Sequence, residues 1–231
     1  MNQNEYAKRV EYNTTLNPQI WDHDRLKSEV KGALIRMAED FIKFVDIPFD
    51  IVDIIITGGN VNYNYTSHSD IDLHIVADFD TIKCDREVQE LFDTKRLLYK
   101  RQYDLIIHNI PVELYIEDHR MPAVSAGTFS VMHDRWLNKP SKHLPKYNEE
   151  ELAHWVGVWR KILRQAVMTG DLQTCRNALK LLRAYRKKGL QTSQGEFSIP
   201  NLVYKSLRND KVIEGITVLI DRLHDQQLSI Y

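Results

Sequence analysis

The hydrophobic pattern of the chain begins with a segment of helical spacing. Residues 24–45 place apolar side chains three and four positions apart, which predicts an amphipathic helix. The apolar positions are Leu26, Val30, Ala33, Leu34, Met37, Phe41, Phe44 and Val45. Pro48 follows closely and is expected to end this segment.

Between residues 51 and 137 the pattern becomes that of a sheet with one inserted helix. Residues 51–56 are apolar and largely β-branched on both faces, which predicts a buried strand that Gly58 and Gly59 end. Residues 70–76 alternate polar and apolar side chains, as a strand with one buried face does. The remaining expected elements are a helix at 86–99, strands at 102–107 and 112–116 around a turn at 108–111, and a short hairpin within 128–137.

The last third of the chain has only helical patterns. Asn148, with Glu151 three residues later, is typical of a helix N-terminus, and this helix is expected to reach about residue 169 before Gly170. Further helices are expected over 172–188, ended by Gly189, from Ser198 and Pro200 onward, and over about 211–226. The order predicts an α+β protein with a catalytic-type domain over residues 1–146 and a helical domain over 147–231.

Composition narrows the class of protein. The 231 residues are 43% hydrophobic and 27% charged, which is ordinary for a folded globular chain and excludes wholesale disorder. No run approaches the ~18 apolar residues that a membrane span needs, and residues 1–9 have no apolar core of a secretory signal. The two cysteines, Cys84 and Cys175, form no paired motif. We therefore expect a cytoplasmic protein that binds no membrane.

Charge is unevenly distributed along the chain. Residues 1–150 carry 18 basic and 25 acidic residues, a net charge of −7, whereas residues 151–231 carry 13 basic and 7 acidic residues, a net charge of +6. An acidic part joined to a basic part suits metal ions on one and phosphates on the other. Two solvated surfaces of different charge explain the asymmetry equally well.

The candidate chemistry centres on Asp70 and Asp72. Side chains two apart on a strand share a face, so these carboxylates can share divalent ions, as in-line nucleotidyl transfer requires. The Gly58-Gly59 turn before them allows a phosphate to approach the backbone. Glu113, between apolar neighbours on a later strand, would add a third carboxylate, and Asp104 is a rival for that position. An exposed strand with two solvated aspartates is the alternative.

These residues together resemble the DNA polymerase β-type nucleotidyltransferase superfamily. The matching pattern is Ile54-Ile55-Ile56-Thr57-Gly58-Gly59, then Ser69-Asp70-Ile71-Asp72-Leu73, then Val112-Glu113-Leu114. A narrower likeness is to nucleotidyltransferases of bacteriophages and some bacteria, carried by Asn62 to Thr66, Ser69 to His74, Val112 to Asp118 and Gly195 to Val203. The superfamily pattern covers about residues 50–118, and the narrower likeness extends over most of the chain.

The resemblance implies a nucleotidyltransferase fold, a mixed sheet with helices on one face followed by a helical domain. It implies Mg²⁺ or Mn²⁺ held by Asp70, Asp72 and Glu113, and an NTP such as ATP whose phosphates lie against Gly58, Gly59 and Ser69. Many members have Gly-Ser where this chain has Gly58-Gly59, so donor binding is expected to be altered. In a phage-encoded protein the compartment would be the host cytoplasm.

Other residues could serve the same site. Lys205 and Arg208 lie three apart on one helix face and are expected to contact the triphosphate. Other basic residues of this part of the chain are Arg183, Arg186, Lys187 and Lys188. His74 could lie beside the metals or serve as a structural neighbour. Tyr63 and Tyr65 could stack a base or pack the loop.

The sequence thus predicts a transferase of nucleotidyl groups, of the EC 2.7.7 type, that moves NMP from an NTP to a hydroxyl acceptor and releases pyrophosphate. The acceptor is left open and includes nucleic acid, such as an RNA 3′ end, a small molecule or a protein side chain. Two alternatives remain: a non-catalytic nucleotide- or partner-binding module on the same fold, and a phosphohydrolase that uses the same metals.

Overall fold

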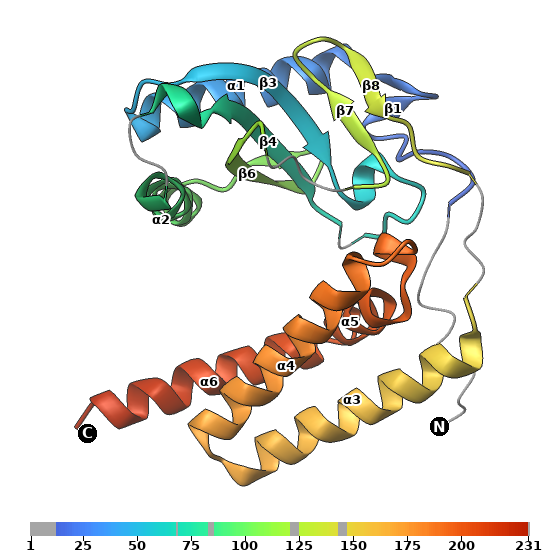
Figure 1. The fold of residues 1–231 in the computed structure, drawn as a ribbon, viewed down its shortest axis with the longest axis vertical. Helices are drawn as coiled ribbons and strands as arrows, with labels where there is room; N and C mark the ends of the chain where they lie inside the picture. The colour runs from blue at the N-terminus through green and yellow to red at the C-terminus, as the bar shows by residue number, and fades with distance from the viewer. Residues whose placement is uncertain (1–12, 68, 83–85, 121–124, 143–146, 231) are drawn as a thin grey trace. The chain divides into compact units, whose positions relative to one another are not determined.

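The computed structural model describes residues 13–67, 69–82, 86–120, 125–142 and 147–230. The contacts within the chain divide it into two compact units (Figure 1). We call the unit that spans residues 12–143 the sheet unit, and the described residues from 147 onward the helical unit. The two units are described separately below.

The sheet unit is built on a mixed six-stranded sheet in the order β5-β6-β4-β3-β7-β8. The central β4 and β6 run parallel, and every other pair of neighbours is antiparallel. The strands are β3 (Asp50–Thr57), β4 (Ile71–Asp78), β5 (Ile106–Ile107), β6 (Ile110–Asp118), β7 (Thr128–Ser130) and β8 (Arg135–Asn138). The chain is therefore α+β, as its pattern predicts.

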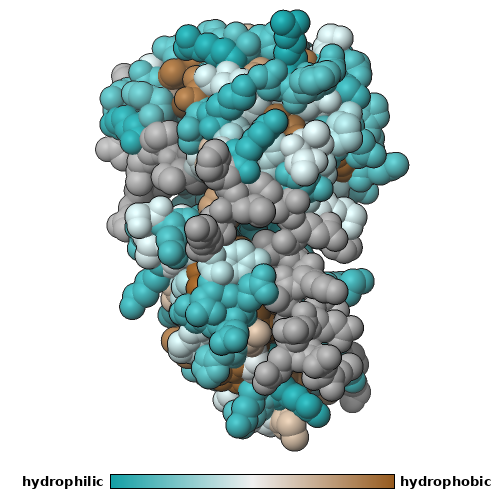
Figure 2. Space-filling model, turned by 90° about the vertical axis from the view of Figure 1, so that its right-hand side faces the viewer, coloured by the Kyte–Doolittle hydropathy of each residue, from teal (hydrophilic) through white to brown (hydrophobic). Residues whose placement is uncertain are grey.

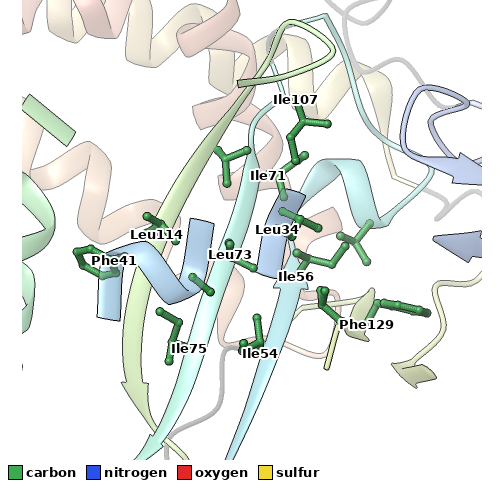
Figure 3. Close-up of a cluster of buried hydrophobic side chains, with 14 of the residues drawn as sticks. Leu34, Phe41, Ile54, Ile56, Ile71, Leu73, Ile75, Ile107, Leu114 and Phe129 are labelled. Carbon is green, nitrogen blue, oxygen red and sulfur yellow. The ribbon is translucent and has the colours of Figure 1, made fainter. Parts of the chain in front are cut away.

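One face of this sheet packs on two helices, α1 (Ser28–Val45) and α2 (Arg86–Gln102). Alternate strand residues such as Ile54, Ile71 and Leu73 point into a single core with the apolar stripe of α1 (Figure 3). Each residue between them points to the opposite face. The alternation along β4 therefore separates a helix-covered apolar face from a polar face.

Two predicted boundaries in the sheet unit are wrong. The first helix begins at Ser28 rather than at residue 24, because residues before it form a hairpin of β1 (Trp21–Asp22) and β2 (Arg25–Leu26). Trp21 is buried there, stacked on Trp136 with ring centroids 4.8 Å apart. Packing from a distant strand thus overrides the local helical spacing.

The strand expected over residues 102–107 is also largely wrong, because α2 continues to Gln102 and β5 has only two residues. The turn is tighter than the four residues expected. His108 and Asn109 both have positive φ, 48° and 66°, and Ile107 already pairs with Ile110. Such two-residue turns favour Asn, which tolerates the left-handed region. The predicted hairpin within 128–137 is confirmed as β7 and β8.

The helical unit contains α3 (Glu149–Thr169), α4 (Leu172–Leu190), α5 (Ile199–Asn209) and α6 (Val212–Leu228), with a short 3₁₀ turn, η5 (Gly195–Phe197). Asn148 caps α3 as predicted, because its side chain accepts from Glu150 N and Glu151 N. Gly189 does not end α4, which continues to Leu190. A Cβ at Gly189 would lie 2.5 Å from Ser198 Oγ, so the glycine permits close packing of the next segment.

The two cores take up most of the apolar residues. The surface turned to the viewer in Figure 2 is mainly hydrophilic, with scattered hydrophobic residues. Among the helices of the described residues, none combines the length and the apolar character needed to cross a bilayer.

Candidate metal and nucleotide site

Three carboxylates gather at one edge of the polar sheet face. In the register, Asp72 of β4 pairs with Glu113 of β6 on one side and with Thr57 of β3 on the other. Asp70 immediately precedes β4. Asp70, Asp72 and Glu113 each offer one oxygen, and these oxygens all lie within 4.8 Å of one another. The sheet register thus joins the predicted aspartate pair to the predicted glutamate.

Gly58 lies directly against this group. Its backbone has φ 90° and ψ −167°, a conformation that residues with a Cβ rarely adopt. A Cβ at this position would lie 2.4 Å from Asp72 Oδ2. The glycine is therefore needed both for the turn after β3 and for the space that the Asp72 carboxylate occupies.

Gly59 and Ser69 are adjacent in the same loop. A Cβ at Gly59 would lie 2.9 Å from Ser69 Oγ, and that hydroxyl accepts a 3.0 Å hydrogen bond from Thr66 N. The Ser69 hydroxyl thus occupies the space that a side chain at position 59 would need. Glycine at position 59 thus leaves the hydrogen bond between Thr66 N and Ser69 Oγ undisturbed.

Asn60, which is 1% exposed, holds the start of β4 in place. Its Nδ2 donates to Ser69 O at 3.1 Å and to Asp70 O at 2.8 Å, and its Oδ1 accepts from Asn17 Nδ2 at 2.8 Å. The loop between Gly58 and Asp70 is therefore closed by a buried asparagine. This contact fixes the backbone from which the Asp70 side chain projects.

Glu113 contacts two basic residues of α2. Lys100 Nζ donates to Glu113 Oε1, Arg96 Nη1 lies 4.0 Å from Oε2, and Tyr115 Oη donates to Oε2 at 2.8 Å. Burial raises the pKa of Glu113, but Lys100 and Tyr115 outweigh it, so the pKa lies below its ordinary value. Glu113 is thus held as a carboxylate.

The neighbouring carboxylates change the pKa of Tyr115. Burial and the charges of Asp72 and Glu113 raise its pKa well above the ordinary value. Tyr115 therefore remains a hydroxyl donor to Glu113 at physiological pH. A pocket between α2 and β6 is lined in part by Arg96, Lys100 and Glu113, so it adjoins the acidic group.

His74 lies in the next row of the polar face and is 8% exposed. Its Nε2 is 3.1 Å from Thr57 Oγ1, its Nδ1 is 3.1 Å from Glu117 Oε2, and its ring stacks on Tyr115 at 4.8 Å. These contacts favour a role as a structural neighbour. Asp104, the rival third carboxylate, is exposed in the segment after α2 and is not part of the acidic group.

The aromatic and basic candidates differ in placement. Tyr63 is 3% exposed, which favours packing over base stacking, and Tyr65 is partly buried. Lys205 and Arg208 lie on α5 of the helical unit, three residues apart as predicted, and Lys205 Nζ is 3.7 Å from Glu196 Oε2. Their contact with a triphosphate stays a prediction.

The donor set fits a hard divalent cation. Mg²⁺ and Mn²⁺ prefer oxygen ligands, and Asp70, Asp72 and Glu113 supply three carboxylates. Carboxylates this close repel one another unless cations lie among them. The three carboxylates would therefore be the ligands of such an ion.

Comparisons with known proteins add no further assignment. No protein-family model matches this chain, and no curated protein or solved structure matches it. The function therefore has to be argued from the residues and their geometry.

The sequence interpretation missed four residues that organise this site: Asn60, Arg96, Lys100 and Tyr115. Strand alternation could have indicated Tyr115, because it lies two residues after Glu113 and so shares its strand face. Arg96 and Lys100 are four apart on a helix and share a face, but nothing local connects that face to Glu113. Asn60 is one of several loop asparagines, and its role depends on closure of the loop.

Proposed function

We propose that this chain is a divalent-metal-dependent nucleotidyltransferase of the DNA polymerase β type. The observation that carries the proposal is the acidic group, in which oxygens of Asp70, Asp72 and Glu113 lie within 4.8 Å of one another. Two metal ions held by shared carboxylates are the usual means of in-line transfer at phosphorus. In this proposal NMP passes from an NTP to a hydroxyl acceptor.

Three further features support the proposal. The acids lie on the polar face of a mixed sheet whose other face packs on helices. Gly58 places a turn without a side chain directly against Asp72, as a backbone that contacts a donor phosphate would require. The residues that resemble the superfamily are the ones that the sheet register brings together.

Each residue then has a defined task. Asp70, Asp72 and Glu113 would hold the ions, and Ser69 with the Gly58-Gly59 backbone would lie along the donor phosphates. Bound Mg²⁺ would supply Lewis acidity to the α-phosphate and acidity to the acceptor hydroxyl. The acceptor oxygen forms a bond to the α-phosphorus, the bond from that phosphorus to pyrophosphate breaks, and the hydroxyl proton passes to solvent. The main contribution of the protein itself would be to orient the donor and the acceptor.

The test uses the purified chain, each α-labelled NTP, Mg²⁺ or Mn²⁺, and a pool of RNA, DNA and small hydroxyl acceptors. Label transfer and pyrophosphate release are followed together. We expect transfer by the native chain and none by the Asp70→Asn/Asp72→Asn variant. Asp104→Asn is the matched control, because it removes an exposed carboxylate outside the group and should leave transfer unchanged.

The outcomes separate the alternatives. Release of inorganic phosphate without label transfer would identify a phosphohydrolase. Metal-independent nucleotide binding that survives in the Asp70→Asn/Asp72→Asn variant, with no turnover on any acceptor, would identify a binding module. Equal transfer by the native chain and the double variant would overturn the assignment of the acidic group.

A further inference from the structure

A small pocket opens between the C-terminal half of α2 and β6, beside the acidic group. It has an apolar wall and a charged rim. The wall is formed by the rings of Tyr99 and Tyr103 and the aliphatic side chains of Leu105, Val112 and Leu114. The proposed function uses only the rim, through Glu113, so the apolar wall has no assigned role.

The wall of the pocket is held in place by the fold. Tyr99 is buried, and its Oη donates to Asp40 Oδ2 at 2.6 Å. Leu105 O accepts a hydrogen bond from Val112 N at 2.9 Å, which ties the segment after α2 to β6. Tyr103 packs on Tyr99 with ring centroids 4.8 Å apart, and yet it is 48% exposed. The pocket therefore presents one half-exposed aromatic ring beside surfaces that are already fixed.

The rim of the pocket carries two cations one helical turn apart, Arg96 and Lys100. Arg96 Nε is buried and has no hydrogen-bond partner among the described residues, since Asp93 Oδ1 lies 4.0 Å from it. Arg96 Nη1 is also 4.0 Å from Glu113 Oε2, beyond hydrogen-bond distance. Lys100 Nζ donates to Glu113 Oε1, although most of the lysine side chain is exposed. Two of the lining residues are thus cations that face a single lining carboxylate.

The wall and the rim together favour one class of ligand. An aromatic and aliphatic wall favours a flat ring, which would remove apolar surface from water and pack on Tyr103. A largely desolvated guanidinium with an unused N–H gains from an anionic oxygen, and Glu113 shows that Lys100 binds a carboxylate at this place. The pocket is small and open to solvent, so it suits a single ring.

We propose that this pocket binds a small aromatic carboxylate, with its ring against Tyr103 and Leu105 and its carboxylate at Arg96 and Lys100. Lys100 is then shared, so the ligand competes with Glu113 for the ammonium group. The pocket is thereby linked to the acidic group through Glu113 alone. The inference does not depend on the proposed function, because it needs no metal, no nucleotide and no transfer step.

The experiment measures binding of para-fluorophenylacetate to the full chain by fluorine NMR titration, in the presence of a chelator. Two related probes form parallel arms: para-fluorophenylacetamide has the ring without the charge, and fluoroacetate has the charge without the ring. We expect each of these to bind about tenfold more weakly or less, because each lacks one half of the contacts. A single-stranded oligonucleotide is added as a competitor and should not displace the aromatic carboxylate.

Substitutions separate the wall from the rim. Tyr103→Ser and Arg96→Gln should each weaken binding by about tenfold, through loss of the ring contact and of the charge-assisted contact. Lys100→Met should weaken it several-fold. Glu113→Gln releases Lys100 and should tighten binding several-fold, which a general loss of structure could not do. Arg101→Met is the matched control, because it removes an exposed charge beside Lys100 that does not line the pocket, and it should leave the affinity unchanged within about twofold.

Further controls keep the result decisive. Thermal melting shows whether each variant is folded, and Tyr103→Ser and Lys100→Met, at exposed positions, carry the test if Arg96→Gln does not fold. Asp70→Asn/Asp72→Asn should bind para-fluorophenylacetate at least as tightly as the native chain, so failure of the nucleotidyltransferase proposal leaves this result intact. The inference is overturned by absence of binding, by equal affinity for the carboxylate and the amide, by equal weakening in Arg101→Met and Lys100→Met, or by displacement with the oligonucleotide.

Discussion

The sheet unit and the helical unit each contain an asparagine that is 1% exposed and holds neighbouring segments in place, Asn60 in the first and Asn201 in the second. Asn60 fixes the backbone of Ser69 and Asp70, whereas Asn201 fixes the Arg186 side chain and the Glu196 backbone. Asn60 thus positions the start of β4, whereas Asn201 joins α4 to the turn before α5. The same kind of side chain serves the candidate site in one unit and the packing of helices in the other.

The largest expected effect comes from Asn60→Ala. The variant leaves Asn17 Nδ2, Ser69 O and Asp70 O without their hydrogen-bond partner, which predicts a loss of about 3 kcal/mol at roughly 1 kcal/mol for each group. Urea unfolding measures the loss. Asn177→Ala, at an exposed position of α4, controls for amide removal as such. A loss below about 1 kcal/mol would show that the loop does not depend on Asn60.

Gly58→Ala should cost about 2–3 kcal/mol, because it combines an unfavourable φ with a contact to Asp72. Gly215→Ala is the control: that glycine lies inside α6 with nothing within 4 Å of an added Cβ, so alanine should stabilise the chain by about 1 kcal/mol. Unfolding midpoints of both variants give the comparison. Equal behaviour of the two would mean that Gly58 is not required by its surroundings.

The sequence predicts the members of the acidic group but not their pairing, for a physical reason. Asp70 and Asp72 can be assigned to one face from the alternation of β4 alone, and the apolar neighbours of Glu113 orient it likewise. The pairing of Asp72 with Glu113 requires the parallel register of β4 and β6, which no local pattern encodes. In the same way, helical spacing places Lys205 and Arg208 on one face of α5, but it does not predict that Lys205 lies beside Glu196.

Local sequence patterns are limited in the same way when they are used to predict the fold. Helices such as α3 and α6 follow from their own periodicity, and their cores lie where that periodicity places them. The β1–β2 hairpin could not be predicted, because its two-residue strands depend on Trp21 packing against Trp136 across about a hundred residues. Counter-charges such as Lys100 are missed for the same reason, since they depend on which helix face reaches Glu113.

Asn201→Ala should cost about 2 kcal/mol, less than Asn60→Ala, because two partners are orphaned rather than three. Urea unfolding of this variant beside Asn60→Ala measures the difference. A stability loss as large as that of Asn60→Ala would contradict the comparison of the two amides.

Removing charge from the acidic group should have a smaller effect of the opposite sign. Without divalent ions the three carboxylates repel one another, so Asp70→Asn/Asp72→Asn should stabilise the chain by about 1 kcal/mol in the presence of a chelator. Mg²⁺ should raise the melting temperature of the native chain and of Asp104→Asn, and leave that of the double variant unchanged. A Mg²⁺ response of the double variant equal to the native one would remove the acids as ligands.

The smallest effect concerns the pH dependence of stability at Lys205. Burial and the charges of Arg208 and Arg186 hold the pKa of Lys205 below its ordinary value, against the attraction of Glu196. The unfolded chain therefore binds this proton more tightly than the folded chain, so the free energy of unfolding should rise with pH between the two pKa values. Lys205→Arg keeps its charge across this range and should lack that rise. Urea unfolding of both chains at increasing pH measures the difference, and identical pH profiles would show that burial does not weaken proton binding at Lys205.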